Sequence, residues 1–490
     1  MNVDPPIGKV AIAGGGLAGW SAAAALKRHI PLLEVSIVSP TIPANSIVDR
    51  VISTLPSIMH FHEDLGLSEA DTIASAGSGI RQGTFFEDWA DGRPAYVHAY
   101  GDYGRSIEGT AFHQQWLRAG RAGDIKPFDR FSAAAELGRA GRIAAAHGEK
   151  VGYGLQLTLE RYQQLMRAYA LHLKIVERPG KICAVELRGT DGFVDKLLLD
   201  DGSALAADLF VDCTGPAAAL RSRVGGEFID WSRWLPCDRL IFASAEPNLE
   251  VQLLDRVCTT QCGWRWSASS PLVASYGAAF SSTDAQARDL VESFPDDCRS
   301  SAREIAIRQG RWAQPWAGNC VAIGDAAVTV EPLEWTNLHL LHSQIDRLVS
   351  MMPGRDCSPV ELGEFNRQCS AEADRIRDFI CLHYVTARRD EHFWKDAAAI
   401  EPPDSLAHTL SLFAERGRLP YYEEETFSRD SWLAVLLGQG FEPRRTDPLA
   451  DIVPTERALD SILSFQGALA SFIETQPDYH HAMSGFGQHG

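Results

Sequence analysis

The chain lacks several features that would assign it to a common class of protein. Its ten cysteines are scattered over 490 residues without a Cys-x-x-Cys pair, and structural metal sites usually need ligands paired at such spacing. We therefore expect buried, reduced thiols and no metal site. No uninterrupted apolar run approaches the roughly 18 residues that cross a bilayer. The first residues show neither the basic nor the apolar region of a signal peptide, so we expect a cytoplasmic protein.

Basic residues are also scarce. There are 46 Lys and Arg against 64 Asp and Glu, which gives a net charge of −18. Nucleic acids and anionic membranes bind proteins that cluster Lys and Arg, so the sequence predicts neither partner, and solubility alone accounts for the acidity. A chain of this length can bury a large core and form more than one subdomain.

Residues 9–26 have the pattern of a dinucleotide-binding unit. A short apolar strand precedes a glycine turn and an alanine-rich helix, and Gly14, Gly16 and Gly19 have the spacing G-x-G-x-x-G. The first glycine permits a tight turn, the second lets a pyrophosphate approach the backbone, and the third lets the helix pack on the strand. The helix N-terminus then offers N–H groups to the phosphates. A bare glycine turn is the alternative, but the flanking strand and helix favour a dinucleotide site.

One usual partner of this unit is missing. An Asp or Glu that binds the ribose normally follows the second strand, which we expect to end at residue 38. Ser39 and Pro40 stand there instead. The ribose contact must therefore differ or be weaker.

Two further apolar strands end in turns of a similar kind. Residues 209–215 are an apolar strand that ends in the turn Thr214-Gly215. Residues 319–327 are a second such strand, whose turn contains the pair Gly324-Asp325. Three such strand ends in this order are typical of FAD-containing monooxygenase folds, in which the Asp reaches the ribityl chain or phosphate of the flavin. A plain turn is the alternative at each position. Jointly they predict FAD, held by the three glycines, Gly324 and Asp325.

The pattern of elements predicts an α/β fold. Strand-rich stretches occupy residues 184–215 and 238–281, whereas residues from 334 onward have helical periodicity. We therefore expect a Rossmann-type FAD-binding module with an interleaved substrate β-sheet over residues 1–355. Residues 356–490 are expected to form a helical C-terminal subdomain that completes the substrate pocket.

Several segments, in order over most of the chain, resemble the flavin-dependent tryptophan halogenase family. Residues 331–336 (Glu-Pro-Leu-Glu-Trp-Thr) resemble its E-P-L-E-S-T motif, and residues 14–20 resemble its G-G-G-x-A-G-W. The other similar segments are residues 96–101, 230–239, 263–266, 375–379 and 431–436. The resemblance implies reduced FAD, oxygen and a halide, chloride or bromide, which together halogenate a small aromatic substrate such as an indole or tryptophan. It also implies a separate flavin reductase.

The resemblance implies catalytic and halide-binding residues. Glu334 corresponds to the glutamate that polarises the oxidant or takes the ring proton, with a helix-starting Glu as the structural alternative. Arg81 stands where the family has a lysine, and a guanidinium cannot readily be deprotonated. Thr336 and Asn337 occupy the halide-binding positions, beside Trp335, which replaces a serine.

Substrate contacts are implied for His98, Tyr100 and Trp432, each of which could instead be a core residue. Residues 47–54 replace a glycine-rich loop that cradles the flavin in the family. These departures leave two alternatives: a flavin monooxygenase of the same fold without halide chemistry, or an inactive paralogue that binds a ligand or partner enzyme. A homodimer is left open.

Overall fold

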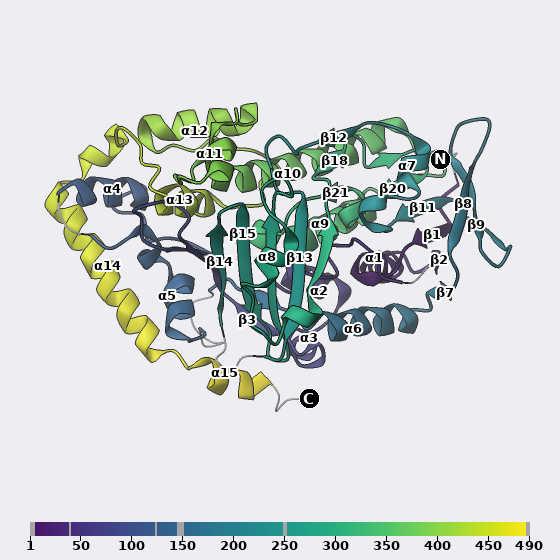
Figure 1. The fold of residues 1–490 in the computed structure, drawn as a ribbon, viewed down its shortest axis with the longest axis horizontal. Coiled ribbons are helices and arrows are strands. Elements are labelled where there is room, and N and C mark those ends of the chain that lie inside the picture. The colour runs from purple at the N-terminus through teal and green to yellow at the C-terminus, as the bar shows by residue number, and fades with distance from the viewer. Residues whose placement is uncertain (1–4, 39–40, 123–124, 145–150, 248–251, 487–490) are drawn as a thin grey trace.

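The computed structural model describes residues 5–38, 41–122, 125–144, 151–247 and 252–486. Two large sheets and a set of C-terminal helices form its layers (Figure 1). The helical elements are α1 (Gly16–His29), α2 (Ser57–Leu65), α3 (Glu69–Ala76), α4 (Phe112–Ala122), α5 (Ala133–Ala140), α6 (Leu159–His172), α7 (Arg221–Val224), α8 (Ala287–Val291), α9 (Asn337–Ser350), α10 (Pro359–Val385), α11 (His392–Ala399), α12 (Asp404–Arg416), α13 (Arg429–Gly438), α14 (Thr455–Thr475) and α15 (Tyr479–Phe486).

The first sheet confirms the predicted Rossmann-type unit. Its strand order is β19 (Trp316–Ala317), β20 (Cys320–Ala322), β11 (Leu209–Asp212), β1 (Lys9–Ala13), β2 (Glu34–Val38) and β7 (Val176–Arg178). All neighbours pair in parallel except β19 with β20. The central strands are buried on both faces, which explains their continuous apolar sequences. Helix α1 connects β1 to β2, as the sequence predicts.

The register of this sheet brings the three predicted strand ends together. Ala13 pairs with Asp212, and Asp212 pairs with Ala322. The glycine turn, the Thr214-Gly215 turn and the Gly324-Asp325 turn follow directly, so all three lie at the same edge. Ligands of open α/β sheets bind at this carboxyl edge.

The second sheet lies between the first sheet and the C-terminal helices (Figure 1). Its order is β17 (Arg303–Ala306), β13 (Arg239–Ala245), β16 (Ala274–Phe280), β15 (Gly263–Ser269), β14 (Leu254–Thr260), β4 (Gly83–Glu87) and β5 (Tyr96–Ala99). Smaller sheets pair β3 (Gly79–Arg81) with β6 (Gly154–Gln156), β12 (Phe228–Asp230) with β18 (Gly310–Trp312) and β21 (Val328–Thr329), and β8 (Ile182–Leu187) with β9 (Val194–Leu199) and β10 (Ala204–Ala206).

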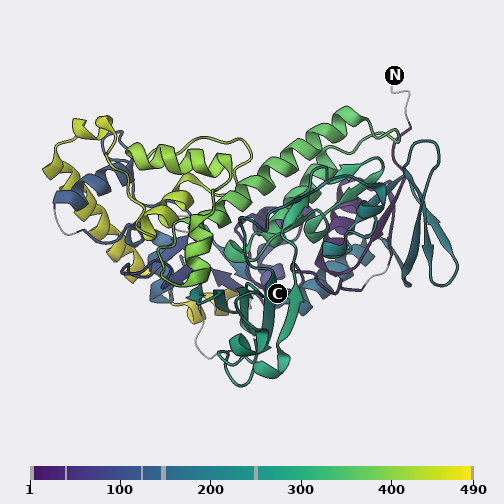
Figure 2. The ribbon, with the colours of Figure 1, turned by 45° about the horizontal axis from the view of Figure 1, so that its top comes forward.

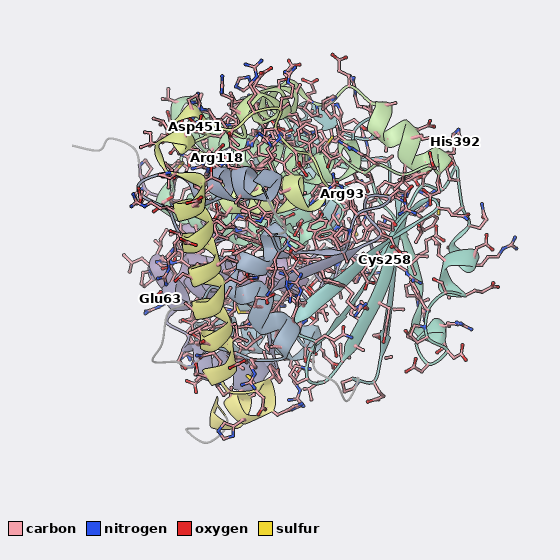
Figure 3. The ribbon with its side chains drawn as sticks, turned by 90° about the vertical axis from the view of Figure 1, so that its left-hand side faces the viewer. Glu63, Arg93, Arg118, Cys258, His392 and Asp451 are labelled. Atoms are coloured by element: carbon pink, nitrogen blue, oxygen red, sulfur yellow. The ribbon has the colours of Figure 1, made fainter. Side chains whose placement is uncertain are left out.

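Helix α10 links the two ends of the molecule. It runs from the first sheet, where it contacts β19, to the C-terminal helices, where it contacts α11, α12 and α13 (Figure 2). Helix α14 lies along α4 and α5, and Arg118 of α4 forms an ion pair with Asp451 over 3.3 Å (Figure 3). Within the described residues, no helix is long and apolar enough to cross a membrane. The division into residues 1–355 and 356–490 stays a prediction.

The start of α9 lies where two hydrophobic cores meet. Trp335 belongs to the core formed with the second sheet and the C-terminal helices, whereas Leu338 belongs to the core around α1 and the first sheet. Any residue in the turn that leads into α9 is therefore buried between two layers. This turn contains the predicted catalytic and halide-binding residues.

Gly19→Ala should destabilise the fold. A Cβ at Gly19 would lie 2.1 Å from the carbonyl oxygen of Gly14. This oxygen is a backbone atom, so it cannot move away by a side-chain rotation. We expect a loss on the order of 1–3 kcal/mol in the free energy of unfolding, measured by urea denaturation. Gly467→Ala in α14 is the matched control, because its Cβ would have nothing within 4 Å, and should stabilise by about 0.5–1 kcal/mol. Equal effects of the two substitutions would contradict this account.

Candidate active site

Glu334 lies in the turn between β21 and α9. Glu334 and Trp335 both have left-handed backbone conformations, with φ angles of 68° and 60°. Such angles are uncommon for residues with side chains and cluster at functional sites. The side chain of Glu334 is only 2% exposed. An ordinary glutamate at a helix start would need neither the strained backbone nor this burial.

Two histidines flank the Glu334 carboxylate. Nδ1 of His98, in β5, lies 2.8 Å from Oε1 of Glu334, and Nε2 of His383, in α10, lies 3.1 Å from the same oxygen. The amide nitrogen of Gln439 donates to Nδ1 of His383 over 3.3 Å, while its oxygen accepts from Thr386. This arrangement assigns the proton of His383 to Nε2, the nitrogen that faces Glu334.

The histidines determine the charge of Glu334. Burial alone would raise its pKa, but the charge of His98 and the hydrogen bonds of His383 and His98 outweigh burial and lower the pKa to about 2. Burial lowers the pKa of His383. Glu334 therefore carries a full negative charge at neutral pH. A carboxylate with so low a pKa accepts protons poorly but strongly stabilises a positive charge nearby.

Arg81 forms a buried ion pair with Asp255. Its Nε donates to the carboxylate of Asp255, and its Nη atoms donate to Oγ1 of Thr84 over 2.6 Å and to the carbonyl of Thr54 over 3.2 Å. The guanidinium also lies 5.9 Å from the ring centroid of Trp335. A catalytic role for Arg81 stays a prediction, since these contacts explain the residue structurally.

The start of α9 has unpaired donors. Among the described residues, Nε1 of Trp335 and Oγ1 of Thr336 are buried donors without a hydrogen-bond partner, whereas the unpaired Oδ1 of Asn337 is an acceptor. The Asn337 side chain is oriented by its amide, which donates to the carbonyl of Val330 over 2.9 Å. Unpaired buried donors beside the N–H groups of a helix start are the chemistry that an anion requires. The Thr336 hydroxyl and the backbone N–H groups of Thr336 and Asn337 therefore fit a halide, whereas the Asn337 side-chain oxygen cannot donate to one.

The glycine turn has the backbone of a dinucleotide cradle. A Cβ at Gly14 would lie 2.4 Å from the carbonyl oxygen of Cys213, and Gly19 packs against Gly14. Asp325 lies at the same sheet edge, where Ile47 and Val48 donate backbone N–H groups to its carboxylate over 2.6 and 3.1 Å. Burial raises the pKa of Asp325 to about 6.

The carboxylate of Asp49 occupies the cradle, that is, the space beside the glycine turn and the start of α1. Oδ1 of Asp49 accepts the backbone N–H of Leu17 over 2.7 Å, in the first turn of α1. A Cβ at Gly16 would lie 2.4 Å from Oδ2 of Asp49. The turn, the helix and Asp325 thus fit FAD, provided that Asp49 moves aside. Ser39 and Pro40 lie outside the described residues, so the altered ribose contact stays a prediction.

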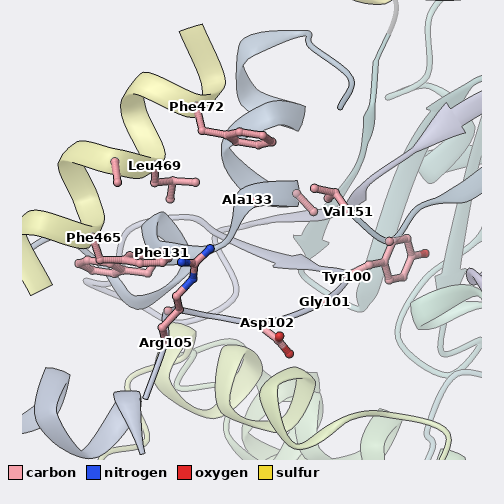
Figure 4. A pocket seen from close by; sticks show the side chains of 14 residues that line it. Tyr100, Gly101, Asp102, Arg105, Phe131, Ala133, Val151, Phe465, Leu469 and Phe472 are labelled. Atoms are coloured by element: carbon pink, nitrogen blue, oxygen red, sulfur yellow. The ribbon is translucent and has the colours of Figure 1, made fainter. Parts of the chain in front are cut away.

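The three predicted substrate residues do not line one cavity. His98 contacts Glu334, as described. Tyr100 lines a cavity of about 540 Å³ between α14, α5 and residues 100–105 (Figure 4). Trp432 lines a different cavity of about 520 Å³ together with Tyr422 and Phe427.

An aromatic chain connects the Trp432 cavity to Glu334. Phe379 stacks on Phe427 at 3.8 Å and meets the edge of Trp432 at 5.0 Å between ring centroids. His98 lies 5.5 Å from Phe379. The Tyr100 ring, which lines the cavity in Figure 4, instead lies 5.3 Å from the Arg81 guanidinium.

Sequence reasoning did not identify His383 or Asp49. His383 follows Phe379 by one helical turn, and this spacing on a segment that resembles the family could have indicated it. Asp49 lies in residues 47–54, for which sequence reasoning considered only the missing glycines. The informative signal was the residue gained, a carboxylate next to a predicted phosphate cradle.

The charge of Glu334 should make stability depend on pH. The folded pKa is about 2 and the ordinary value is 4.5, so the contribution is present above about pH 4.5 and is lost as pH falls toward 2. The difference in unfolding free energy between wild type and Glu334→Gln should therefore shrink by a few kcal/mol between about pH 6 and pH 3.

Urea denaturation at both pH values measures this difference. Glu364→Gln is the control, because Glu364 also has a pKa of about 2 but lies in solvent beside Arg367, where screening weakens the effect. An equal change for both variants would show that the histidines do not stabilise the Glu334 carboxylate.

Known proteins are similar to this chain over nearly its whole length. The sequence pattern of the tryptophan halogenase family matches residues 9–455. The chain is 28% identical to the tryptophan 6-halogenase SttH of Streptomyces toxytricini, over 99% of both proteins. It superposes on the flavin-dependent halogenase BrvH from Brevundimonas sp. BAL3 with a TM-score of 0.92 and 33% identity, over 99% of this chain and 100% of that one.

A flavin-dependent halogenase from Xanthomonas campestris gives a TM-score of 0.93 at 31% identity, over 98% of each chain. The predicted resemblance and fold class are thereby confirmed. Family members are FAD-dependent halogenating enzymes, and the family implies FAD and a halide. The chain belongs to the tryptophan halogenase family.

Proposed function

We propose that this chain is a flavin-dependent halogenase that acts on an aromatic, indole-like substrate. Reduced FAD comes from a separate flavin reductase, and chloride or bromide is the co-substrate. The observation that carries the proposal is the buried Glu334 carboxylate, held ionised by two histidines beside a helix start with unpaired donors. A cytoplasmic location and a homodimer stay predictions.

Glu334 and His98 have separate roles: Glu334 stabilises a positive charge, and His98 accepts a proton. Electrophilic attack on an aromatic ring places a positive charge on the ring before a proton leaves, and the Glu334 carboxylate stabilises that charge. Its pKa of about 2 makes it a weak proton acceptor. Nε2 of His98 is buried and unpartnered among the described residues. In the neutral form of His98, whose Nδ1–H donates to Glu334, this nitrogen accepts the ring proton. The carboxylate stabilises the resulting imidazolium, the charged form of His98 that lowers the pKa of Glu334.

The start of α9 binds the halide. The N–H groups of Thr336 and Asn337, with Nε1 of Trp335 and Oγ1 of Thr336, supply the donors. Gly14, Gly16, Gly19, Gly324 and Asp325 hold FAD at the sheet edge. FAD supplies the oxidising equivalent, derived from oxygen, that turns halide into an electrophile.

The Trp432 cavity is the better candidate for the aromatic substrate. Its wall continues through Phe427 and Phe379 to His98. The other cavity ends at Tyr100, behind which Arg81 is already paired with Asp255. Both cavities have the size of small-molecule sites.

The assay combines the protein with FAD, an unrelated flavin reductase, NADH, oxygen, halide and a panel of indoles. Halogenated product, detected by mass spectrometry, is expected with the reductase and not without it. A hydroxylated product without halide dependence would instead assign the chain as a monooxygenase. Absence of any product despite bound FAD would contradict the proposal.

His98→Gln should abolish most turnover while preserving the fold. Glutamine can still donate to Glu334 but cannot accept the ring proton, so we expect a loss of about 10²–10⁴-fold in kcat. Glu334→Gln should cause a similar loss, whereas Glu364→Gln should leave turnover unchanged. Near-normal turnover of His98→Gln would show that another group accepts the proton.

A further inference from the structure

We propose that Asp49 is an internal competitor for FAD, whose carboxylate occupies the pyrophosphate position at the start of α1. FAD must displace this side chain in order to bind. The inference rests on the proposed function, because it concerns the cofactor site of that function. A single residue, Asp49, thereby lowers the affinity of this chain for FAD.

The first argument is the position of the Asp49 carboxylate. Oδ1 accepts the N–H of Leu17 over 2.7 Å, one of the helix-start donors that phosphate oxygens require. Oδ2 lies 2.4 Å from where a Cβ of Gly16 would be. Gly16 is the glycine of the motif that lets a pyrophosphate approach the backbone. The carboxylate therefore satisfies the helix start as a phosphate would, with the same sign of charge.

The second argument is the anchoring of Asp49. Oγ of Ser46 donates to Oδ2 of Asp49 over 2.7 Å and also lies 3.1 Å from Oδ2 of Asp325. Asp325 in turn holds Ile47 and Val48 by their backbone N–H groups. The candidate flavin-binding carboxylate Asp325 is thus engaged by the same segment that fills the cradle. Residues 46–49 occupy both contacts at once.

The third argument is charge. Asp49 is partly buried, and burial raises its pKa, although the Leu17 and Ser46 hydrogen bonds favour the ionised form. A pyrophosphate and a carboxylate cannot share one helix start, because like charges in a buried site repel strongly. Binding of FAD therefore requires residues 46–49 to leave, and the broken hydrogen bonds reduce the net affinity.

Titration of the apoprotein with FAD, followed by flavin fluorescence and calorimetry, tests the inference. Asp49→Gly removes the competing carboxylate and should tighten FAD binding by about 10–100-fold relative to wild type. Ser46→Ala leaves the carboxylate in place but removes its anchor, and should tighten binding by a smaller factor. Asp102→Gly, an exposed aspartate away from the cradle, should leave the affinity unchanged. Circular dichroism checks that each variant is folded.

Hydrogen exchange gives a second readout that does not depend on activity. Addition of FAD to wild type should increase amide exchange at Ile47 and Val48, because they lose Asp325 as acceptor, while exchange at Leu17 stays slow. Equal FAD affinity of folded Asp49→Gly, Ser46→Ala and wild type would overturn the inference and leave the proposed function standing. No FAD binding by either wild type or Asp49→Gly would overturn both.

Discussion

The parallel pairing of β1, β11 and β20 is the constraint on which the site depends. One register places Ala13, Asp212 and Ala322 side by side, so three turns distant in sequence meet at one edge. The chain then passes from Asp325 through the short strand β21 into the turn that carries Glu334. A slip of this register would separate the glycine turn from Asp325 and displace the start of α9. The same three strands therefore position the candidate cofactor-binding edge and Glu334, the candidate catalytic carboxylate.

Three carboxylates in this region, those of Glu334, Asp325 and Asp49, have different partners. Glu334 meets two imidazoles, and its pKa falls to about 2. Asp325 meets backbone N–H groups and a neighbouring carboxylate, and burial raises its pKa to about 6. Asp49 meets the start of α1. Since the cost of burying a charge is offset only by specific partners, the partners determine whether each group acts as a fixed charge, an anchor or an occupant of the cradle.

The sequence predicted the parts of the structure that depend on local pattern. The unit β1–α1–β2 and the strand ends at Asp212 and Gly324 follow from apolar period and glycine spacing. The helical pattern predicted from residue 334 onward begins three residues later, at Asn337, because Glu334 and Trp335 have left-handed backbone angles. The sequence could not predict partners brought together by tertiary packing. His383 reaches Glu334 only because α10 spans the molecule, and Arg81 is neutralised by Asp255 from another strand. Tyr100 and Trp432, grouped by resemblance, line different cavities.

The relative affinity of the protein for FAD and for riboflavin tests the central claim most directly. Riboflavin lacks the pyrophosphate, so it does not need the cradle at the start of α1. If Asp49 occupies that cradle, the free energy needed to displace it offsets most of the binding free energy that the phosphate contacts contribute. FAD should then bind to the wild-type protein less than about tenfold more tightly than riboflavin does. A preference for FAD on the order of a thousandfold would show that the cradle is free, and would contradict the account.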